Sequence, residues 1–243
     1  MGTTTLYKLP SRTELKKEKT GEYSISAIIP AFNEEGWVGE TVKTLCQLSE
    51  IDEIIVIDDG STDRTAHEAG KAGAVVYRSI KNCGKSSSLY YGANIAQGDV
   101  FVFVDADLKH SAFEVKKLIH AVINDEADMA IGAVKLTAKS GLGLTLALAE
   151  HGIFYYTGRK MLSPLSGQRA LKRYLWESLN FYADGFAAEV ALTIESIKKG
   201  FNVKEIPLDI THRFRGNDLS SFFHRARQFY SIMKLLVQTG MRV

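Results

Sequence analysis

Two aspartates follow an unbroken apolar run in the segment VFVDADLKHS, residues 102–111. Asp105 and Asp107 are two positions apart, and in an extended backbone such residues point to the same side. A carboxylate is costly to bury unpaired, so this pair indicates either a cation or a solvent-exposed edge. Mg²⁺ and Mn²⁺ prefer oxygen ligands, and Mg²⁺ often uses one or two carboxylates together with substrate phosphates. The pair therefore predicts a divalent-metal site, and the alternative is that Asp107 only caps the next helix.

A second polar segment, DDGSTD at residues 58–63, also follows an apolar run. Gly60 tolerates unusual dihedral angles and Asp63 can hydrogen-bond local backbone, so the segment is typical of a turn. Carboxylates such as those of Asp58 and Asp59 also accept hydrogen bonds from a nucleobase or a ribose hydroxyl. We expect the turn role and the ligand role to coexist.

The segment NCGKSS, residues 82–87, contains the Gly-Lys-Ser sequence of a phosphate-binding loop. Such a loop needs a glycine five positions before Gly84, and Ser79 stands there instead. The first predicted strand is followed by AFNEEG rather than by the glycine-rich turn of a dinucleotide-binding fold. The sequence therefore predicts neither a phosphate-binding loop of this type nor a dinucleotide-binding turn. Lys85 is either a ligand-binding residue or a solvated residue at a helix start.

Apolar segments of strand length alternate with helical patterns up to residue 135, which indicates a mostly parallel sheet covered on both faces. Ligands of such sheets bind beyond the carboxyl ends of the strands, so PAFNEE, DDGSTD and DADLKH should line one edge. The expected strands are 24–30, 53–59, 74–78, 99–107 and 127–134, and the expected helices are 36–48, 61–73, 84–98 and 111–123.

The pattern changes after residue 135. The elements expected there are helices at 141–162, 185–200 and 218–240, a strand at 201–212, and a loop at 163–173 that leads into a short strand or a helix. No repeat, low-complexity block or clear linker interrupts the sequence. A single domain at 23–243, preceded by a flexible arm at 1–22, is therefore predicted.

The composition limits the classes of function. The chain has 243 residues and a formal net charge of +2, which is too weak to indicate a nucleic-acid partner. Residues 1–22 are polar and lack an apolar leader, and the longest apolar stretch, at 142–149, is too short to span a bilayer. The two cysteines lack metal-ligand spacing. We therefore expect a cytoplasmic protein, with docking onto a membrane face left open.

Four segments, taken together, carry a family resemblance. IIPAFNEEG, VIDDGSTDRT, NCGKSSSLYYG and FVDADL, in this order and spacing, resemble the nucleotide-sugar glycosyltransferases of the GT-A fold, especially family 2. The resemblance implies a Rossmann-like α/β fold, that is, a mostly parallel sheet flanked by helices, with a C-terminal extension on the acceptor side. It also implies Mn²⁺ or Mg²⁺ and a nucleotide-sugar donor such as UDP-glucose. Residues 23–135 would bind the donor and residues 136–243 the acceptor.

The resemblance also implies roles for individual residues in the first half. The residues expected to border the nucleoside are Pro30, Ala31, Asn33 and Glu34 or Glu35. Asp59 is expected to contact the base, and Lys85 the base or the diphosphate. The metal and the diphosphate are expected at Asp105, Ala106 and Asp107.

The second half carries weaker likenesses. SGQRALKR, residues 166–173, resembles a segment of polyprenyl-phosphate sugar transferases, with Gln168 where an aromatic residue is common. It nominates the substrate-binding residues Ser166, Gly167, Gln168 and Arg169. GFAAEVAL and the later THR are similar to glucosyl-3-phosphoglycerate synthases, which nominates His212 as a third metal ligand. A neutral imidazole suits Mn²⁺, and the alternative for His212 is a partly buried residue that closes a strand.

Glycosyl transfer needs a neutralised leaving diphosphate, which the metal would supply as a Lewis acid with Asp107 as a catalytic ligand. Arg213 and Arg215 would add positive charge, or would form only a solvated basic loop. An inverting enzyme with a hydroxyl acceptor also needs a general base, for which Asp184 and Glu189 are the candidates. Glu189 could instead be an ordinary acid in the first turn of a helix. A phosphate acceptor or a retaining mechanism would need no such base, and the sequence leaves that choice open.

The last expected helix carries an apolar stripe with basic residues on other faces. The stripe consists of Leu219, Phe222, Phe223, Ala226, Tyr230, Met233 and Val237. Such a helix can rest on an anionic membrane, but the stripe more often packs on its own core or on a second subunit. The acceptor is left open between a small molecule and a lipid phosphate.

Two other functions are weighed against this transferase. A sugar-phosphate nucleotidyltransferase would use a similar sheet and a metal, but its glycine-rich loop after the first strand is missing. A non-catalytic nucleotide-sugar binding module is disfavoured by the intact pair Asp105 and Asp107.

Overall fold

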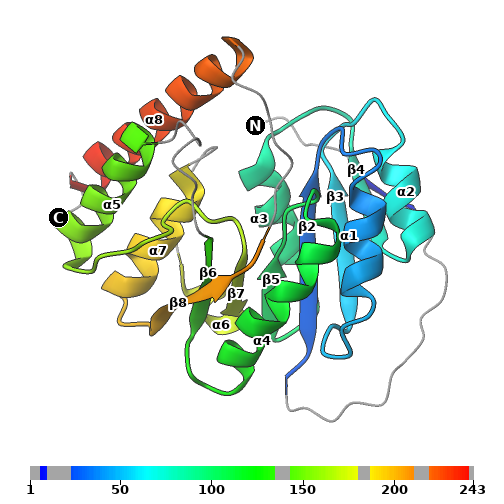
Figure 1. Ribbon diagram of the computed structural model, residues 1–243, viewed down its shortest axis with the longest axis horizontal. Coiled ribbons are helices and arrows are strands. Elements are labelled where there is room, and N and C mark those ends of the chain that lie inside the picture. Colours follow the sequence, from blue (N-terminus) through cyan, green and yellow to red (C-terminus); the bar gives the residue numbers. More distant parts are fainter. Residues whose placement is uncertain (1–5, 10–22, 135–142, 180–186, 211–218, 241–243) are drawn as a thin grey trace.

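A computed structural model describes residues 6–9, 23–134, 143–179, 187–210 and 219–240. One eight-stranded sheet runs through this part of the chain, in the order β1-β4-β3-β2-β5-β7-β6-β8 (Figure 1). The strands are β1 (Leu6–Leu9), β2 (Ile25–Ala31), β3 (Glu53–Asp58), β4 (Val75–Ser79), β5 (Val100–Phe103), β6 (Met129–Val134), β7 (Arg169–Lys172) and β8 (Val203–Leu208). Four residues of the expected N-terminal arm thus form β1.

The sheet is parallel from β4 through β3 and β2 to β5. The pairs β2–β3, β2–β5, β3–β4 and β6–β8 are parallel, whereas β1–β4, β5–β7 and β6–β7 are antiparallel. The expected mostly parallel α/β sheet is confirmed. The short strand that the sequence allowed after residue 163 is β7, whose four residues are all buried between β5 and β6.

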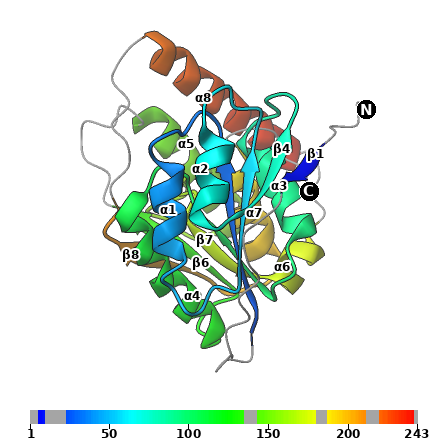
Figure 2. The same ribbon diagram turned by 90° about the vertical axis from the view of Figure 1, so that its right-hand side faces the viewer.

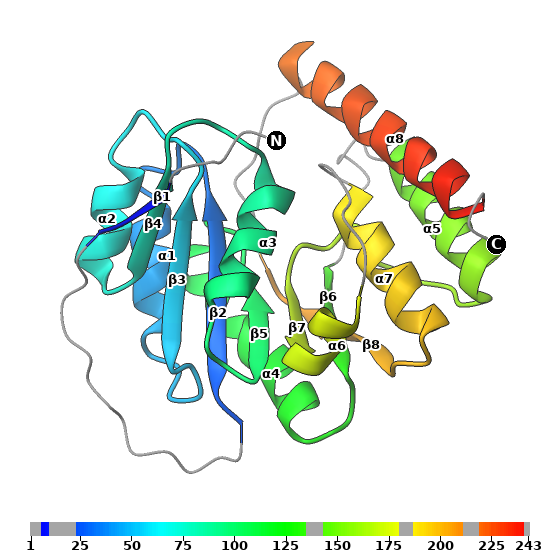
Figure 3. The same ribbon diagram turned by 180° about the vertical axis from the view of Figure 1, so that it is seen from behind.

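Helices cover both faces of the sheet, and each face has its own apolar core. The helices are α1 (Val38–Leu45), α2 (Thr65–Ala72), α3 (Lys85–Ile95), α4 (Lys116–Ile123), α5 (Gly143–Thr157), α6 (Arg173–Ser178), α7 (Ala188–Lys198) and α8 (Leu219–Gly240), with a 3₁₀ turn η1 at Lys109–Val115. One core lies beneath α1, α2 and α4 (Figure 2). The other lies beneath α3, α6 and α7 on the opposite face, with α5 and α8 packed outside α7 (Figure 3).

The last helix packs differently from the sequence prediction. Tyr230, Met233 and Val237 from the predicted packing stripe are 67%, 42% and 53% exposed. The buried position is Ile232, and Leu236 packs so closely against Gly152 of α5 that a methyl group there would lie 2.5 Å from a Leu236 carbon. These three stripe residues therefore do not pack on the protein's own core, because the face that packs is set by the position of α5 rather than by periodicity alone. Their packing on a second subunit or on a membrane stays a prediction.

The parallel strands bring their following loops to one edge, as expected. In register, Ala31 of β2 lies opposite Asp58 of β3, and Ile28 lies opposite Phe103 of β5. One detail differs from the prediction: β5 ends at Phe103, so Asp105 lies in the loop after the strand and Asp107 in a turn. The argument from an extended backbone therefore does not apply to this pair.

No helix in the described ranges combines the length and the apolar character that crossing a membrane requires.

Candidate active site

The loop after β2 and the turn after β3 hold each other in place. The side chain of Asn33 accepts a hydrogen bond from the Thr62 amide at 2.9 Å, and the Asn33 amide donates to Ser61 Oγ, also at 2.9 Å. The Glu35 carboxylate accepts from the Arg64 amide at 3.0 Å. These expected nucleoside residues therefore shape the loops that would border a nucleoside, and their contact with a base stays a prediction.

Pro30 and Ala31, the other expected nucleoside residues, end β2 at this edge, where Pro30 is half-buried and Ala31 is buried. Glu34 lies just beyond and is 7% exposed, and its amide donates to Thr65 Oγ1 at 2.8 Å.

Asp59 organises the start of α3. Its carboxylate accepts hydrogen bonds from the amides of Cys83 at 2.8 Å and Gly84 at 2.7 Å, and the residue is 4% exposed. Burial raises the pKa of the Asp59 carboxyl, although these two amides partly oppose the shift. Gly60 has φ +78°, and a methyl group there would lie 2.9 Å from the Lys81 backbone. This turn therefore needs glycine, and it places Lys85 as the first residue of α3.

Three charged side chains from distant segments meet at this edge. Lys85 Nζ lies 2.7 Å from Asp105 Oδ1 and 3.5 Å from Glu189 Oε1, the latter at the start of α7. The Lys85 side chain is 36% exposed, and those of Asp105 and Glu189 are 23% and 13% exposed. Burial lowers the pKa of the Lys85 ammonium, but the two carboxylates outweigh this and raise it above its usual value. The cluster is therefore a partly buried ion triad that joins three of the predicted site residues.

The segment before β7 closes against this triad. Gln168 is 1% exposed, and its Nε2 donates to Asp105 Oδ2 at 2.9 Å. A methyl group at Gly167 would lie 2.5 Å from Lys85 Nζ and 3.0 Å from Asp105 Oδ1. Within the described chain, Gln168 Oε1 and Ser166 Oγ are buried atoms that accept no hydrogen bond. Glycine at 167 thus permits Lys85 and Asp105 to lie close to the backbone at this position. The two buried oxygens of Gln168 and Ser166 remain available beside it.

Arg169 holds the loop before β7 in position. The residue is 1% exposed, and its guanidinium donates to Ser166 O at 2.9 Å, to Thr193 Oγ1 at 2.9 Å and to Pro164 O at 3.2 Å. Burial lowers the pKa of the guanidinium to about 10, which still leaves it charged at neutral pH. Arg169 therefore ties the 164–166 loop to α7, and direct substrate binding by it stays a prediction.

Thr41 of α1 is a positioning residue that the sequence reasoning missed. It is fully buried, its hydroxyl donates to Ala106 O at 2.8 Å, and it accepts from the Lys109 amide at 2.8 Å. It therefore holds both ends of the loop that carries Asp107. No local signal marks this threonine, because its partners lie about 65 residues further along the chain.

The carboxylates of Asp105 and Asp107 are of the chemical type that suits a metal held jointly with a phosphate ligand, and their binding of an ion stays a prediction. Asp105 belongs to the triad, and Asp107 is half-buried in the same loop. Among the described residues, no group of three His, Cys, Asp or Glu side chains is arranged to hold an ion. Mg²⁺ typically takes one or two carboxylates and completes its shell with water and substrate phosphates, so two aspartates suffice for that arrangement. His212, Asp184, Arg213 and Arg215 lie outside the described residues.

Comparison with known proteins gives consistent matches. The model of the family described as glycosyl transferase family 2 matches residues 26–188. An uncharacterized protein of Methanocaldococcus jannaschii is 30% identical over 195 residues, which cover 76% of this chain and 80% of that protein. The dolichol-phosphate mannosyltransferase of Pyrococcus furiosus is 33% identical over 234 residues, covering 86% of this chain and 64% of the relative.

A solved structure is similar in fold and in sequence. Glucosyl-3-phosphoglycerate synthase from Mycobacterium tuberculosis, in complex with Mn²⁺, UDP-glucose and phosphoglyceric acid, superimposes with a TM-score of 0.74. The two sequences are 25% identical, and the match covers 88% of this chain and 80% of the other.

Proposed function

The chain belongs to glycosyl transferase family 2, and from this premise we propose that it moves a sugar from a nucleoside-diphosphate donor to an acceptor with the help of Mn²⁺ or Mg²⁺. The predicted family and the transferase class are confirmed. The similar synthase is known in complex with UDP-glucose and Mn²⁺, which supports the same donor here. The chain spans 64% of the length of the dolichol-phosphate enzyme, so the acceptor is not carried over from it.

The observation that carries this proposal is the triad of Lys85, Asp105 and Glu189 at the carboxyl edge of the sheet. Asp105 and Asp107 would hold the metal, which when bound would supply Lewis-acid neutralisation of the leaving diphosphate. Lys85 would add its positive charge to the same phosphates, because its ammonium lies within 3 Å of Asp105.

Neighbouring side chains hold Asp105 and the helix start that carries Lys85 in position. Gln168 holds the second oxygen of Asp105 at 2.9 Å, and Asp59 holds the backbone that begins α3. Glu189 lies on the other side of Lys85 and is the described carboxylate that would accept a proton from an acceptor hydroxyl. Lys85 Nζ lies 2.7 Å from Asp105, the proposed metal ligand, and 3.5 Å from Glu189, the candidate base, which supports their acting on one substrate.

A thermal-shift screen of nucleotide sugars with and without Mn²⁺ tests the proposal. At a hundredfold excess over Kd, UDP-glucose or a related donor should raise Tm by about 5–10 °C in the presence of Mn²⁺. The best donor should then release its nucleoside diphosphate in an acceptor panel. Release of pyrophosphate from a nucleoside triphosphate and a sugar phosphate would instead identify a nucleotidyltransferase. Donor binding without hydrolysis or transfer across the panel would indicate a binding module.

Gly167→Ala should damage the site without unfolding the protein. The three atoms nearest to the added methyl group would be the ends of the Lys85 and Asp105 side chains, which can move aside at little cost to the fold. Their displacement should lower kcat/KM by about 10²-fold, because misplacing a charged group by an ångström is enough for such a loss. Steady-state kinetics, with melting curves as the control, check this. Wild-type kinetics in a folded variant would show that the close approach of Lys85 and Asp105 to residue 167 is not needed for activity.

A further inference from the structure

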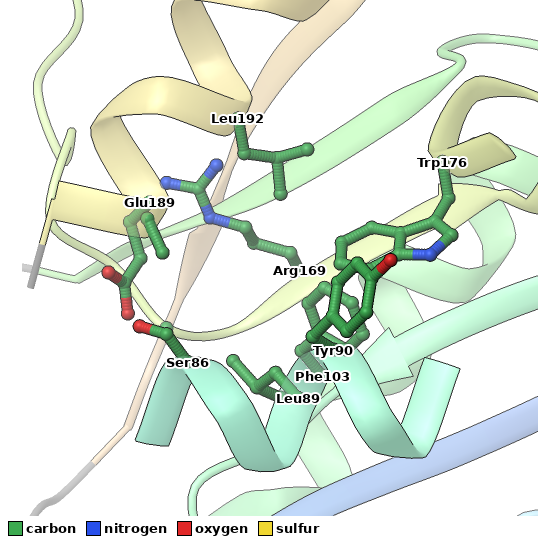
Figure 4. A pocket seen from close by; sticks show the side chains of 10 residues that line it. Ser86, Leu89, Tyr90, Phe103, Arg169, Trp176, Glu189 and Leu192 are labelled. Carbon is green, nitrogen blue, oxygen red and sulfur yellow. The ribbon is translucent and has the colours of Figure 1, made fainter. Parts of the chain in front are cut away.

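A groove opens beside the triad, between α3 and α7 (Figure 4). Its lining residues are Ser86, Leu89, Tyr90, Phe103, Gly167, Arg169, Trp176, Ala188, Glu189 and Leu192. Most of this lining is aromatic or aliphatic, so the groove suits an apolar group.

The two ends of the groove differ in chemistry. Glu189 and Ser86 lie together at one end in Figure 4, and Glu189 is also the member of the triad that reaches Lys85. At the other end the rings of Tyr90 and Trp176 are 6.0 Å apart, and Phe103 packs edge-on against Trp176 at 5.6 Å. The groove is therefore continuous with the proposed reaction centre at its polar end and aromatic at its far end.

The charges along the groove disfavour an anionic occupant. Glu189 is a carboxylate, and Lys85 beside it is already engaged by two carboxylates. Arg169 is a cation, and its guanidinium donates to neutral groups of Ser166, Thr193 and Pro164 and points toward α7 in Figure 4. An anionic group at the polar end would meet the Glu189 carboxylate, which costs free energy, whereas a neutral hydroxyl can donate a hydrogen bond to it.

The spacing of the lining residues along α3 suits a small apolar group. Ser86 and Tyr90 are four residues apart on α3, which corresponds to a rise of about 6 Å along the helix. That span matches one aromatic ring or a short aliphatic chain.

We propose that this groove is the acceptor subsite, and that it takes a neutral alcohol whose hydroxyl is attached to an aromatic or short aliphatic group. This inference rests on the proposed glycosyl transfer. The hydroxyl lies at Glu189 and the apolar group between Leu89, Leu192 and the Tyr90–Trp176 pair. In the reaction the bond from the anomeric carbon to the donor phosphate breaks and a bond to the acceptor oxygen forms. The diphosphate leaves with the electron pair, and the hydroxyl proton passes to Glu189.

This acceptor differs in charge from the one in the similar synthase, whose complex contains phosphoglyceric acid. The difference makes the inference testable with paired probes of equal ring size. 4-Nitrobenzyl alcohol is neutral and carries a hydroxyl, whereas 4-nitrobenzoate carries a negative charge in its place.

Binding can be read from Trp176 itself. The chain has two tryptophans, Trp37 and Trp176, so Trp37→Phe leaves the groove residue as the only one. Titration of this variant without donor or metal should show quenching by 4-nitrobenzyl alcohol at a concentration at least about tenfold lower than by 4-nitrobenzoate. Equal or tighter binding of the benzoate would overturn the inference.

A variant in the groove and a matched control outside it distinguish binding in the groove from nonspecific binding to the surface. Tyr90→Ser removes a ring that is 46% exposed and should raise both the alcohol concentration that gives half-maximal quenching and the KM for the alcohol by about tenfold. Tyr155→Ser removes an 81% exposed tyrosine on α5, outside the groove, and should change neither. Equal effects of the two variants would contradict the assignment.

Transfer assays distinguish failure of this inference from failure of the proposed function. With UDP-glucose and Mn²⁺, glucose should appear on 4-nitrobenzyl alcohol in preference to 3-phosphoglycerate. If the donor binds with metal but 3-phosphoglycerate is the better acceptor, the acceptor assignment is wrong and the transferase stands. If no nucleotide sugar binds, the proposed function fails, while the fluorescence titration still decides whether the groove selects neutral alcohols.

Discussion

Asp105→Asn is expected to lower kcat/KM by about 10³-fold and to abolish the Mn²⁺ dependence of donor binding. The amide keeps the size of the side chain but removes the charge that faces Lys85 Nζ at 2.7 Å and Gln168 Nε2 at 2.9 Å. It is also a much weaker ligand for a hard divalent cation. Calorimetric titration of UDP in the presence of Mn²⁺, together with steady-state kinetics, measures both effects.

A second ion pair in the molecule provides the control for this substitution. Asp125 pairs with Lys172, the last residue of β7, which lies opposite Val100 at the start of β5. Arg169, the residue next to the triad, lies opposite Phe103 at the other end of the same strands. Asp125→Asn should therefore leave UDP binding unchanged. An Asp105→Asn protein that binds UDP and Mn²⁺ like the wild type would remove Asp105 from the metal site.

Glu189→Gln is expected to lower kcat by about 10²- to 10⁴-fold, the usual contribution of a general base, with a much smaller change in the KM of the donor. Its carboxylate is 13% exposed, reaches Lys85 at 3.5 Å and lines the groove proposed for the acceptor. Glutamine preserves the shape and the polar contact but accepts no proton. Single-turnover kinetics over a range of pH would separate this chemical role from a loss of binding.

Glu195→Gln is the matched control, because Glu195 lies on the same helix six residues further on and does not line the groove. It should leave kcat unchanged. If Glu189→Gln also leaves kcat unchanged, the proton is accepted elsewhere or the acceptor is already ionised, and Glu189 is only the partner of Lys85. A rise in KM with an unchanged kcat would lead to the same conclusion.

The sequence by itself determined the local features of this protein. Short apolar runs and period-3.6 patterns predicted the strands and helices between residues 24 and 134, because a strand buried on both faces is apolar throughout and a surface helix buries one face. Their alternation predicted a parallel sheet, and this placed the polar loops near Asn33, Asp59 and Asp105 at one edge. Gly60 was assigned to a turn because glycine tolerates unusual dihedral angles, and its φ of +78° agrees.

The tertiary structure alone decided which side chains meet. Glu189 reaches Lys85 from about 104 residues away, Gln168 reaches Asp105 from 63, and Thr41 reaches Ala106 from 65. These contacts depend on how β7 and α7 pack onto the sheet. Periodicity reports which face of an element is buried, but it carries no information about the partner across the interface. For the same reason the exposed side of α8 and the buried guanidinium of Arg169 became clear only once the neighbouring helices were in place.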